Sequence, residues 1–218
     1  MATAKAVANA KGVELWQYIA EKTGSTPNLP LPMMKVMNGG AHDGWATDIQ
    51  EYMIMPVGAK DIFQAVQMGA ETFHALAKVL KSKCYPTTVG DEGGFAPKLD
   101  GIEDALQSIV DAIKDASYTP GEDVTIAMDC AASEFAVKEN GKYYYDYSQL
   151  SNGLTKDPNG KKLSDDEQIK YLEELLSKYP IDSIEDGLDE NDWENWVKLT
   201  AKIGDRCQLV GDDLFVTN

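Results

Sequence analysis

Acidic side chains follow three of the short apolar runs that the sequence predicts as strands. They are Asp129, Glu185 and Asp212. Because the carboxyl ends of neighbouring parallel strands meet at one rim of a barrel, we expect the three carboxylates to converge there. Converging carboxylates repel one another and need a cation, and oxygen-only ligands with room left for water favour Mg²⁺ over a Ca²⁺ cage. For any one of the three, a solvated turn or a helix cap is the simpler interpretation.

Two glycine-rich segments carry further groups with possible chemistry. Residues 89–97 hold two adjacent carboxylates, the second of them Glu92, between glycines that allow a ligand to approach the backbone closely. Taken alone, this segment is more typical of a polar, glycine-rich turn. Residues 38–44 hold His42, which would act as a cation and hydrogen-bond donor if it faced a phosphate or carboxylate, and is otherwise an ordinary surface residue.

Alternating helix and strand patterns must position these side chains. A helix predicted over 4–22 is followed by a Pro-rich linker at 25–32. Beyond the linker the sequence predicts strands at 33–37 and 52–57, helices at 61–83 and 102–116, a strand at 124–128, a hairpin and loop between 136 and 162, a helix at 165–178, a strand at 180–184, a helix at 192–203 and a strand at 208–210. Strands that alternate with helices indicate an α/β fold with a parallel sheet or barrel.

Three residues mark expected helix ends. Asp100 stands three residues before Glu103 and predicts an N-cap for the helix at 102–116, while Ser164 opens a capping-box spacing. Gly204 predicts the end of the helix at 192–203, as the glycine that follows its last residue.

Composition limits the class of protein. The 218 residues carry 20 Lys and Arg against 36 Asp and Glu, a formal net charge of −16, which argues against direct nucleic-acid binding because that needs a basic surface. No apolar stretch reaches the roughly 18 residues of a transmembrane helix, and the Ala-rich start lacks the apolar core of a signal peptide. The expected location is therefore the cytoplasm. Cys84, Cys130 and Cys207 are widely spaced and odd in number, which fits reduced thiols.

Segments spread over nearly the whole chain, in the same order, resemble the enolase family, the phosphopyruvate hydratases of glycolysis. They are 35–40, 50–58, 89–97, 127–135, 183–193 and 209–218, and the Gly-Leu that follows Ile-Glu-Asp resembles the bacterial type. The resemblance implies an enolase-type modified TIM barrel of the form ββαα(βα)6, here incomplete and ending after the fifth strand. It also implies a terminal helix of the N-terminal domain at 1–24, a linker at 25–32 and a partial catalytic barrel domain at 33–218.

The resemblance also implies a reaction, the reversible Mg²⁺-dependent dehydration of 2-phosphoglycerate to phosphoenolpyruvate. Metal ions stabilise the charge that develops when a proton is removed beside a carboxylate, a strategy of which enolase-superfamily sites with a Lys or His base are an established example. By resemblance, Asp129, Glu185 and Asp212 are the metal ligands. Glu92 corresponds to the acid that assists departure of hydroxide, and Glu51 to its supporting carboxylate.

Two further residues have implied roles, and the sequence departs from the family in other places. His42 corresponds to the loop histidine that closes over the substrate, although residues 41–45 differ from the usual Ser-His-Ala-Gly-Asn, and Asp213 is expected to orient a neighbouring group. The family's proton-abstracting lysine follows the sixth strand, and other substrate-holding residues follow later strands. The 218-residue chain contains none of these strands, so we expect it to be inactive by itself.

A catalytically inactive enolase-like binding or scaffold protein is the alternative interpretation. The resemblance implies 2-phosphoglycerate and phosphoenolpyruvate as ligands, a homodimer for the intact protein, and contacts with RNA-degradation machinery or plasminogen. It also implies cell-surface or secreted locations besides the cytoplasm. A reading frame that continues past Asn218 into the lysine-bearing strand would favour the enzyme. Five strands of an open barrel expose unpaired edges, so we expect the chain to aggregate unless a partner covers them.

Overall fold

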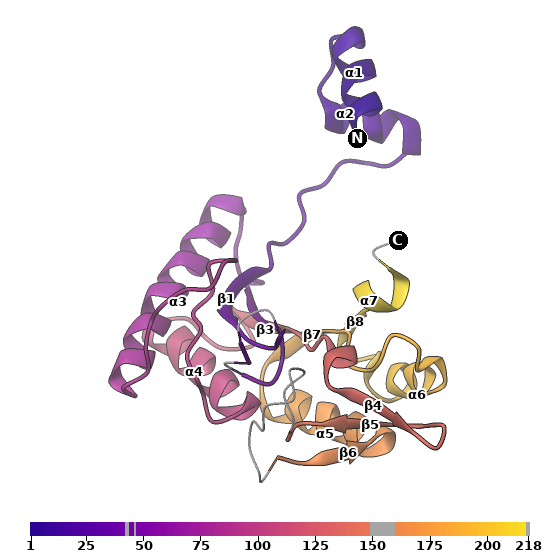
Figure 1. Cartoon of the computed structure of the whole chain (residues 1–218). Coiled ribbons are helices and arrows are strands. Elements are labelled where there is room, and N and C mark those ends of the chain that lie inside the picture. Colours follow the sequence, from indigo (N-terminus) through magenta and orange to yellow (C-terminus); the bar gives the residue numbers. More distant parts are fainter. Residues whose placement is uncertain (42–43, 46, 149–159, 217–218) are drawn as a thin grey trace. The chain divides into compact units, whose positions relative to one another are not determined.

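The computed structural model describes residues 1–41, 44–45, 47–148 and 160–216. The chain forms two compact units, Met1–Leu31 and Pro32–Asn218 (Figure 1).

The first unit is a pair of helices, α1 (Ala2–Lys11) and α2 (Leu15–Thr23). The single helix predicted over 4–22 is therefore wrong. Gly12 adopts a left-handed conformation, φ 69°, and its N–H bonds back to α1, which ends the first helix. The side chain of Glu14 then caps α2. Glycine adopts the left-handed conformation without strain, so the helix can end at Gly12. The spacing of apolar residues hardly changes across such a short break, which is why it suggested one continuous helix.

The second unit is built on an open five-stranded sheet. Its strands, in spatial order, are β1 (Met34–Asn38), β2 (Glu51–Met55), β3 (Thr125–Asp129), β7 (Ile181–Glu185) and β8 (Gln208–Val210). The pairs β1–β2 and β2–β3 are antiparallel, whereas β3–β7 and β7–β8 are parallel. The strands do not close into a barrel within the described residues, so the predicted α/β fold, an incomplete barrel that opens with two antiparallel strands, is confirmed.

Amphipathic helices cover this sheet. They are α3 (Ile62–Ser82), α4 (Ile102–Asp115), α5 (Asp165–Lys178) and α6 (Trp193–Ile203), followed by the single turn α7 (Asp212–Phe215); a short 3₁₀ turn, η2 (Ala132–Glu134), follows β3. The four long helices begin and end within one residue of the predicted bounds. Figure 1 shows α3 and α4 packed side by side next to β1.

The helix caps agree with the sequence in two cases of three. Ser164 accepts a hydrogen bond from the N–H of Glu167 and completes the predicted capping box of α5. Asp100 does not cap α4, because Gly101 occupies the N-cap position, and the N–H of Asp100 instead points to the carboxylate of Asp104 at 3.4 Å. Gly204 follows the last residue of α6 and its N–H bonds back to the carbonyl of Thr200, so the helix ends where the sequence predicts. The glycine is right-handed, φ −67°, because the chain continues from α6 into a further turn.

A second, antiparallel sheet carries the predicted hairpin. Its strands are β4 (Ala136–Glu139), β5 (Lys142–Asp146) and β6 (Lys162–Ser164). Asn140 and Gly141 form the two-residue connection with φ values of 51° and 82°, the positive values that a type I′ turn requires. The hairpin is confirmed, and the part of the predicted loop at 149–159 lies outside the described residues.

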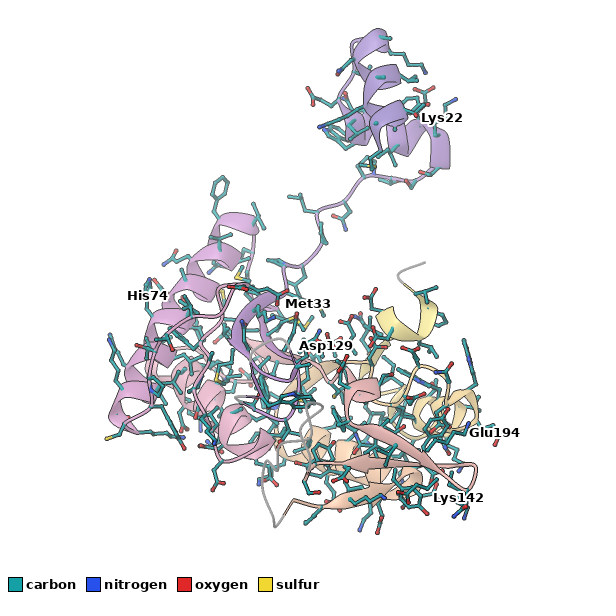
Figure 2. All side chains as sticks on the ribbon, viewed as in Figure 1. Lys22, Met33, His74, Asp129, Lys142 and Glu194 are labelled. Atoms are coloured by element: carbon teal, nitrogen blue, oxygen red, sulfur yellow. The ribbon has the colours of Figure 1, made fainter. Side chains whose placement is uncertain are left out.

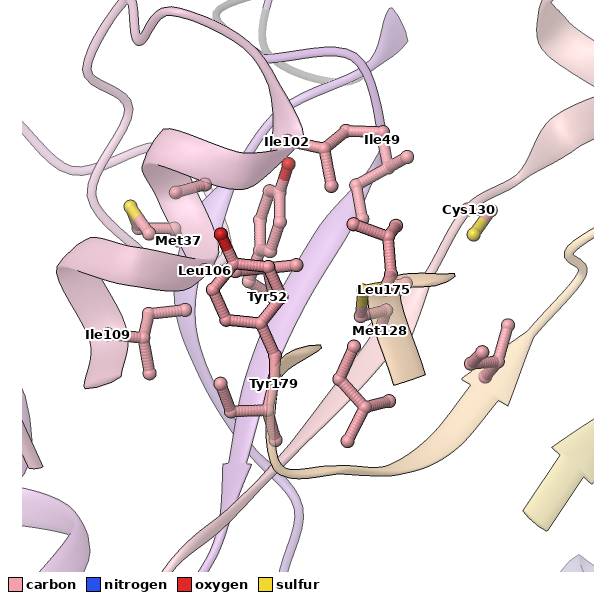
Figure 3. Packing of buried hydrophobic residues seen from close by; sticks show 14 of the residues in the cluster. Met37, Ile49, Tyr52, Ile102, Leu106, Ile109, Met128, Cys130, Leu175 and Tyr179 are labelled. Carbon is pink, nitrogen blue, oxygen red and sulfur yellow. The ribbon is translucent and has the colours of Figure 1, made fainter. Parts of the chain in front are cut away.

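The apolar core lies between the main sheet and its helices. Tyr52 of β2, Met128 of β3, and Leu106 and Ile109 of α4 are all at most 1% exposed, and Figure 3 shows them facing one another. This packing holds the strand ends, and the acidic residues on them, in fixed positions. The three cysteines are free thiols, as predicted. Among the described residues, no helix combines the length and the apolar character needed to cross a membrane.

Candidate metal centre

A row of acidic residues crosses the main sheet where β3 and β7 end. Glu51, the first residue of β2, pairs directly with Asp129, the last residue of β3, and Asp129 is in register with Glu185, the last residue of β7. Residues paired across neighbouring strands project from the same face of a sheet. The backbone register therefore gathers three carboxylates at one rim, where Figure 2 labels Asp129.

The tightest acidic group consists of Asp129, Glu185 and Asp186. One carboxylate oxygen from each lies within 4.8 Å of the others. Consecutive strand residues normally point to opposite faces, but Asp186 has a left-handed backbone, φ 42°, directly after the end of β7. This break in the alternation turns two consecutive carboxylates toward the same point.

Asp186 is only 3% exposed, and its two oxygens differ in their surroundings. Oδ2 accepts the backbone N–H groups of Asp212, at 3.2 Å, and Asp213, at 2.9 Å. Oδ1 is buried without a hydrogen-bond partner. A buried carboxylate oxygen without a donor is unfavourable, and a cation at the cluster would satisfy it.

Asp129 is the most deeply placed of the carboxylates that the sequence predicted. It accepts hydrogen bonds from Gln50 Nε2 and from the N–H of Ala131, each at 3.0 Å. Even so, burial, followed by the nearby charge of Glu185, raises the pKa of Asp129 to about 8. Burial, followed by the charge of Asp186, raises the pKa of Glu185 to about 7. Proximity and burial both oppose ionisation here, and a divalent cation would offset both.

Lys35 connects two more of the predicted site residues, Glu51 and Glu92. Its Nζ donates to Glu51 Oε1 at 3.0 Å and also forms an ion pair with Glu92. Sequence reasoning did not identify Lys35 as part of the site. The available signal was a single lysine inside the otherwise apolar strand at 33–37.

A tight turn in residues 89–97 presents Glu92. The N–H of Gly90 bonds to the carbonyl of Gly94, and Phe95 exchanges backbone hydrogen bonds with β1. A Cβ on Gly94 would lie 2.3 Å from Asn38 Oδ1 and 3.0 Å from the Met37 backbone, so only glycine lets the turn approach β1 this closely. Gly94, one of the glycines predicted to let a ligand approach the backbone, thus lets the turn approach its own sheet.

The other predicted site residues, His42, Asp212 and Asp213, are not members of the tight acidic group as the structure describes it. His42 lies outside the described residues. Asp212 begins α7 and is not part of the tight acidic group, although its charge contributes to raising the pKa of Glu185. Asp213 contacts Asp186 through its backbone N–H. The structure therefore brings together Asp129, Glu185 and the unpredicted Asp186, and the role of Asp212 as a metal ligand stays a prediction.

The family comparison agrees with these motifs. A family model described as the C-terminal TIM barrel domain of enolase matches residues 26–218, which include every site residue named above.

Proposed function

This chain belongs to the enolase family, and on that basis we propose that it contributes the metal-binding and acid groups for the reversible, Mg²⁺-dependent dehydration of 2-phosphoglycerate to phosphoenolpyruvate. Membership of the family supports a lyase of the enolase superfamily. The specific substrate is our proposal.

The observation that carries this proposal is the acidic group formed by Asp129, Glu185 and Asp186. One oxygen from each of the three carboxylates lies within 4.8 Å of the others, and Asp186 Oδ1 is buried without a hydrogen-bond partner. Such a group of oxygens fits a small hard cation. These residues would hold Mg²⁺, with Asp212 close by on α7. When bound, the ion would stabilise the negative charge that develops on the substrate carboxylate after proton loss.

The second group of side chains supplies the acid. In the dehydration direction, the carboxylic acid of Glu92 gives its proton to the departing hydroxyl oxygen, which leaves as water; in the reverse direction the carboxylate takes a proton from water. Its side chain is 51% exposed, so it exchanges protons with solvent between turnovers. Glu51, which is more buried, stands beside it and is joined to it through Lys35.

Calorimetric titration tests the proposal. We expect Mg²⁺ to bind the 218-residue chain, and 2-phosphoglycerate to tighten Mg²⁺ binding by about threefold or more, because two ligands that meet in one site are thermodynamically linked. The isomer 3-phosphoglycerate, whose free hydroxyl and phosphate are exchanged, should have a smaller effect.

Matched variants identify the site. Glu185→Gln should abolish Mg²⁺ binding, whereas Asp205→Asn, which removes an exposed carboxylate from the turn after α6, should not alter it. Unchanged Mg²⁺ affinity in Glu185→Gln, or an Mg²⁺ affinity indifferent to 2-phosphoglycerate, would contradict the proposal.

A further inference from the structure

Lys35 is a cation at the acidic rim to which the proposed reaction assigns no role. Its side chain is 12% exposed, and its ammonium group contacts both Glu51 and Glu92. Burying a charge is unfavourable unless the charge is paired, and Lys35 has two carboxylate partners. Without it, two carboxylates would face each other beside an already acidic group.

The sheet register directs Lys35 toward Glu51. Lys35 of β1 lies opposite Met53 of β2, and Glu51 is two residues from Met53 on the same strand. The register shifts by one residue between Lys35 and Met37, so Glu51 itself lies opposite Asn38. Diagonal neighbours of this kind share a face and lie within reach of a long side chain. The flanking residues Val36 and Met37 are at most 1% exposed, so the strand is packed in place and the stem of the lysine starts from a fixed backbone.

Glu92 has a much less constrained position of its own. It projects from the turn in residues 89–97, and the backbone of that turn is joined to β1 through Phe95, three residues away. Lys35 connects the carboxylate itself to the sheet. The direction of the Glu92 side chain therefore depends on this contact.

We propose that Lys35 is a positioning residue that clamps Glu92 beside Glu51 and thereby fixes the acid at the edge of the metal-binding group. The importance of that position for dehydration rests on the proposed function. The clamp itself is a property of the fold and is measured without substrate or metal.

Hydrogen exchange in the turn tests the clamp. Lys35→Met should speed exchange of the Gly90 and Gly93 amides, both hydrogen-bonded within the turn, by about tenfold, the change that corresponds to losing one charge-assisted hydrogen bond. The Phe95 amide, bonded to β1, serves as the internal reference. Lys35→Arg keeps the charge and should restore slow exchange.

Two further variants separate positioning from general stability. Glu92→Met removes the same contact from its exposed side, because methionine offers Lys35 no carbonyl or carboxylate acceptor. It tests the clamp even if Lys35→Met folds poorly, and Lys35→Met should add little to it in the double variant. Lys83→Met removes a comparable lysine that pairs with Asp104 and should leave the turn unchanged.

The outcomes distinguish the two proposals. Slow exchange in both Lys35→Met and Glu92→Met, or additive effects in the double variant, would overturn the clamp. A chain whose Mg²⁺ affinity ignores 2-phosphoglycerate but whose turn is released in Lys35→Met would overturn the proposed function and support the clamp.

Discussion

Replacing Asp129 by Asn should stabilise the chain without divalent cations and remove the stabilisation by Mg²⁺. Asn has nearly the same shape as Asp, and the N–H of Ala131 can still donate to its oxygen. Gln50, which donates to the other Asp129 oxygen, can turn its amide so that it accepts from the new NH₂ group. The substitution therefore removes the charge while the hydrogen bonds remain satisfied.

The size of the effect follows from the burial of Asp129. Its pKa rises from 3.8 to about 8. A carboxyl with a raised folded pKa contributes fully to stability below its unfolded pKa, near 4, and loses this contribution as the pH rises toward 8. At pH 7 the difference amounts to about 4 kcal/mol, of which the neutral Asn side chain should recover a large part.

Magnesium should narrow the difference in stability between the two proteins, because it binds the parent and not the variant. At a concentration 100 times its dissociation constant, a ligand stabilises the folded state by about 3 kcal/mol, which raises Tm by roughly 6–12 °C for a chain of this size. We expect this increase in the parent chain and not in Asp129→Asn.

Thermal unfolding at pH 7 with EDTA, and then with Mg²⁺, measures both effects, and Asp205→Asn is the control. A lower stability of Asp129→Asn than of the parent in EDTA would contradict the unfavourable burial of the Asp129 charge. An equal rise in Tm of both proteins with Mg²⁺ would contradict the role of Asp129 in binding the ion.

Other measurements test the rest of the argument. Gly94→Ala should lower the free energy of unfolding by about 1–3 kcal/mol in urea titrations, because its Cβ would meet Asn38 Oδ1 at 2.3 Å. Ile109→Ala, which leaves a cavity at a fully buried position, should lower it by about 2–5 kcal/mol. Burial alone would raise the pKa of Asp104, but hydrogen bonds, first the one from Lys83, hold this pKa below its usual value. The ionised Asp104 therefore stabilises the fold above its unfolded pKa near 4, and this stabilisation should be lost as the pH falls through the lower folded pKa. Urea titrations at several pH values should show this loss in the parent and not in Asp104→Asn. A coupled assay should find no conversion of 2-phosphoglycerate by the 218-residue polypeptide alone, and measurable turnover would show that the predicted need for a later lysine is wrong.

The amino-acid sequence determined the elements of the fold and much of the chemistry. Helical spacing of apolar residues is local, so α4 and α5 begin and end close to where the pattern places them. Strand ends are also local, which is why Asp129 and Glu185 were identified at the rim. Local patterns were less reliable where one backbone angle decides the outcome, as at Gly12, which divides the predicted first helix.

Tertiary structure alone decided which side chains meet. The sequence predicted Asp212 as the third member of the acidic group, but the left-handed backbone of Asp186 brings Asp186 there instead. The spacing of apolar residues carries no information about that backbone angle. The contact of Lys35 with Glu92 joins residues 57 positions apart and depends on strand register and on the approach of a glycine turn to β1. The sequence supplied the acidic groups. Only the register of the packed sheet, which is a non-local property, set the distances between them and placed the ammonium group of Lys35 beside two of them.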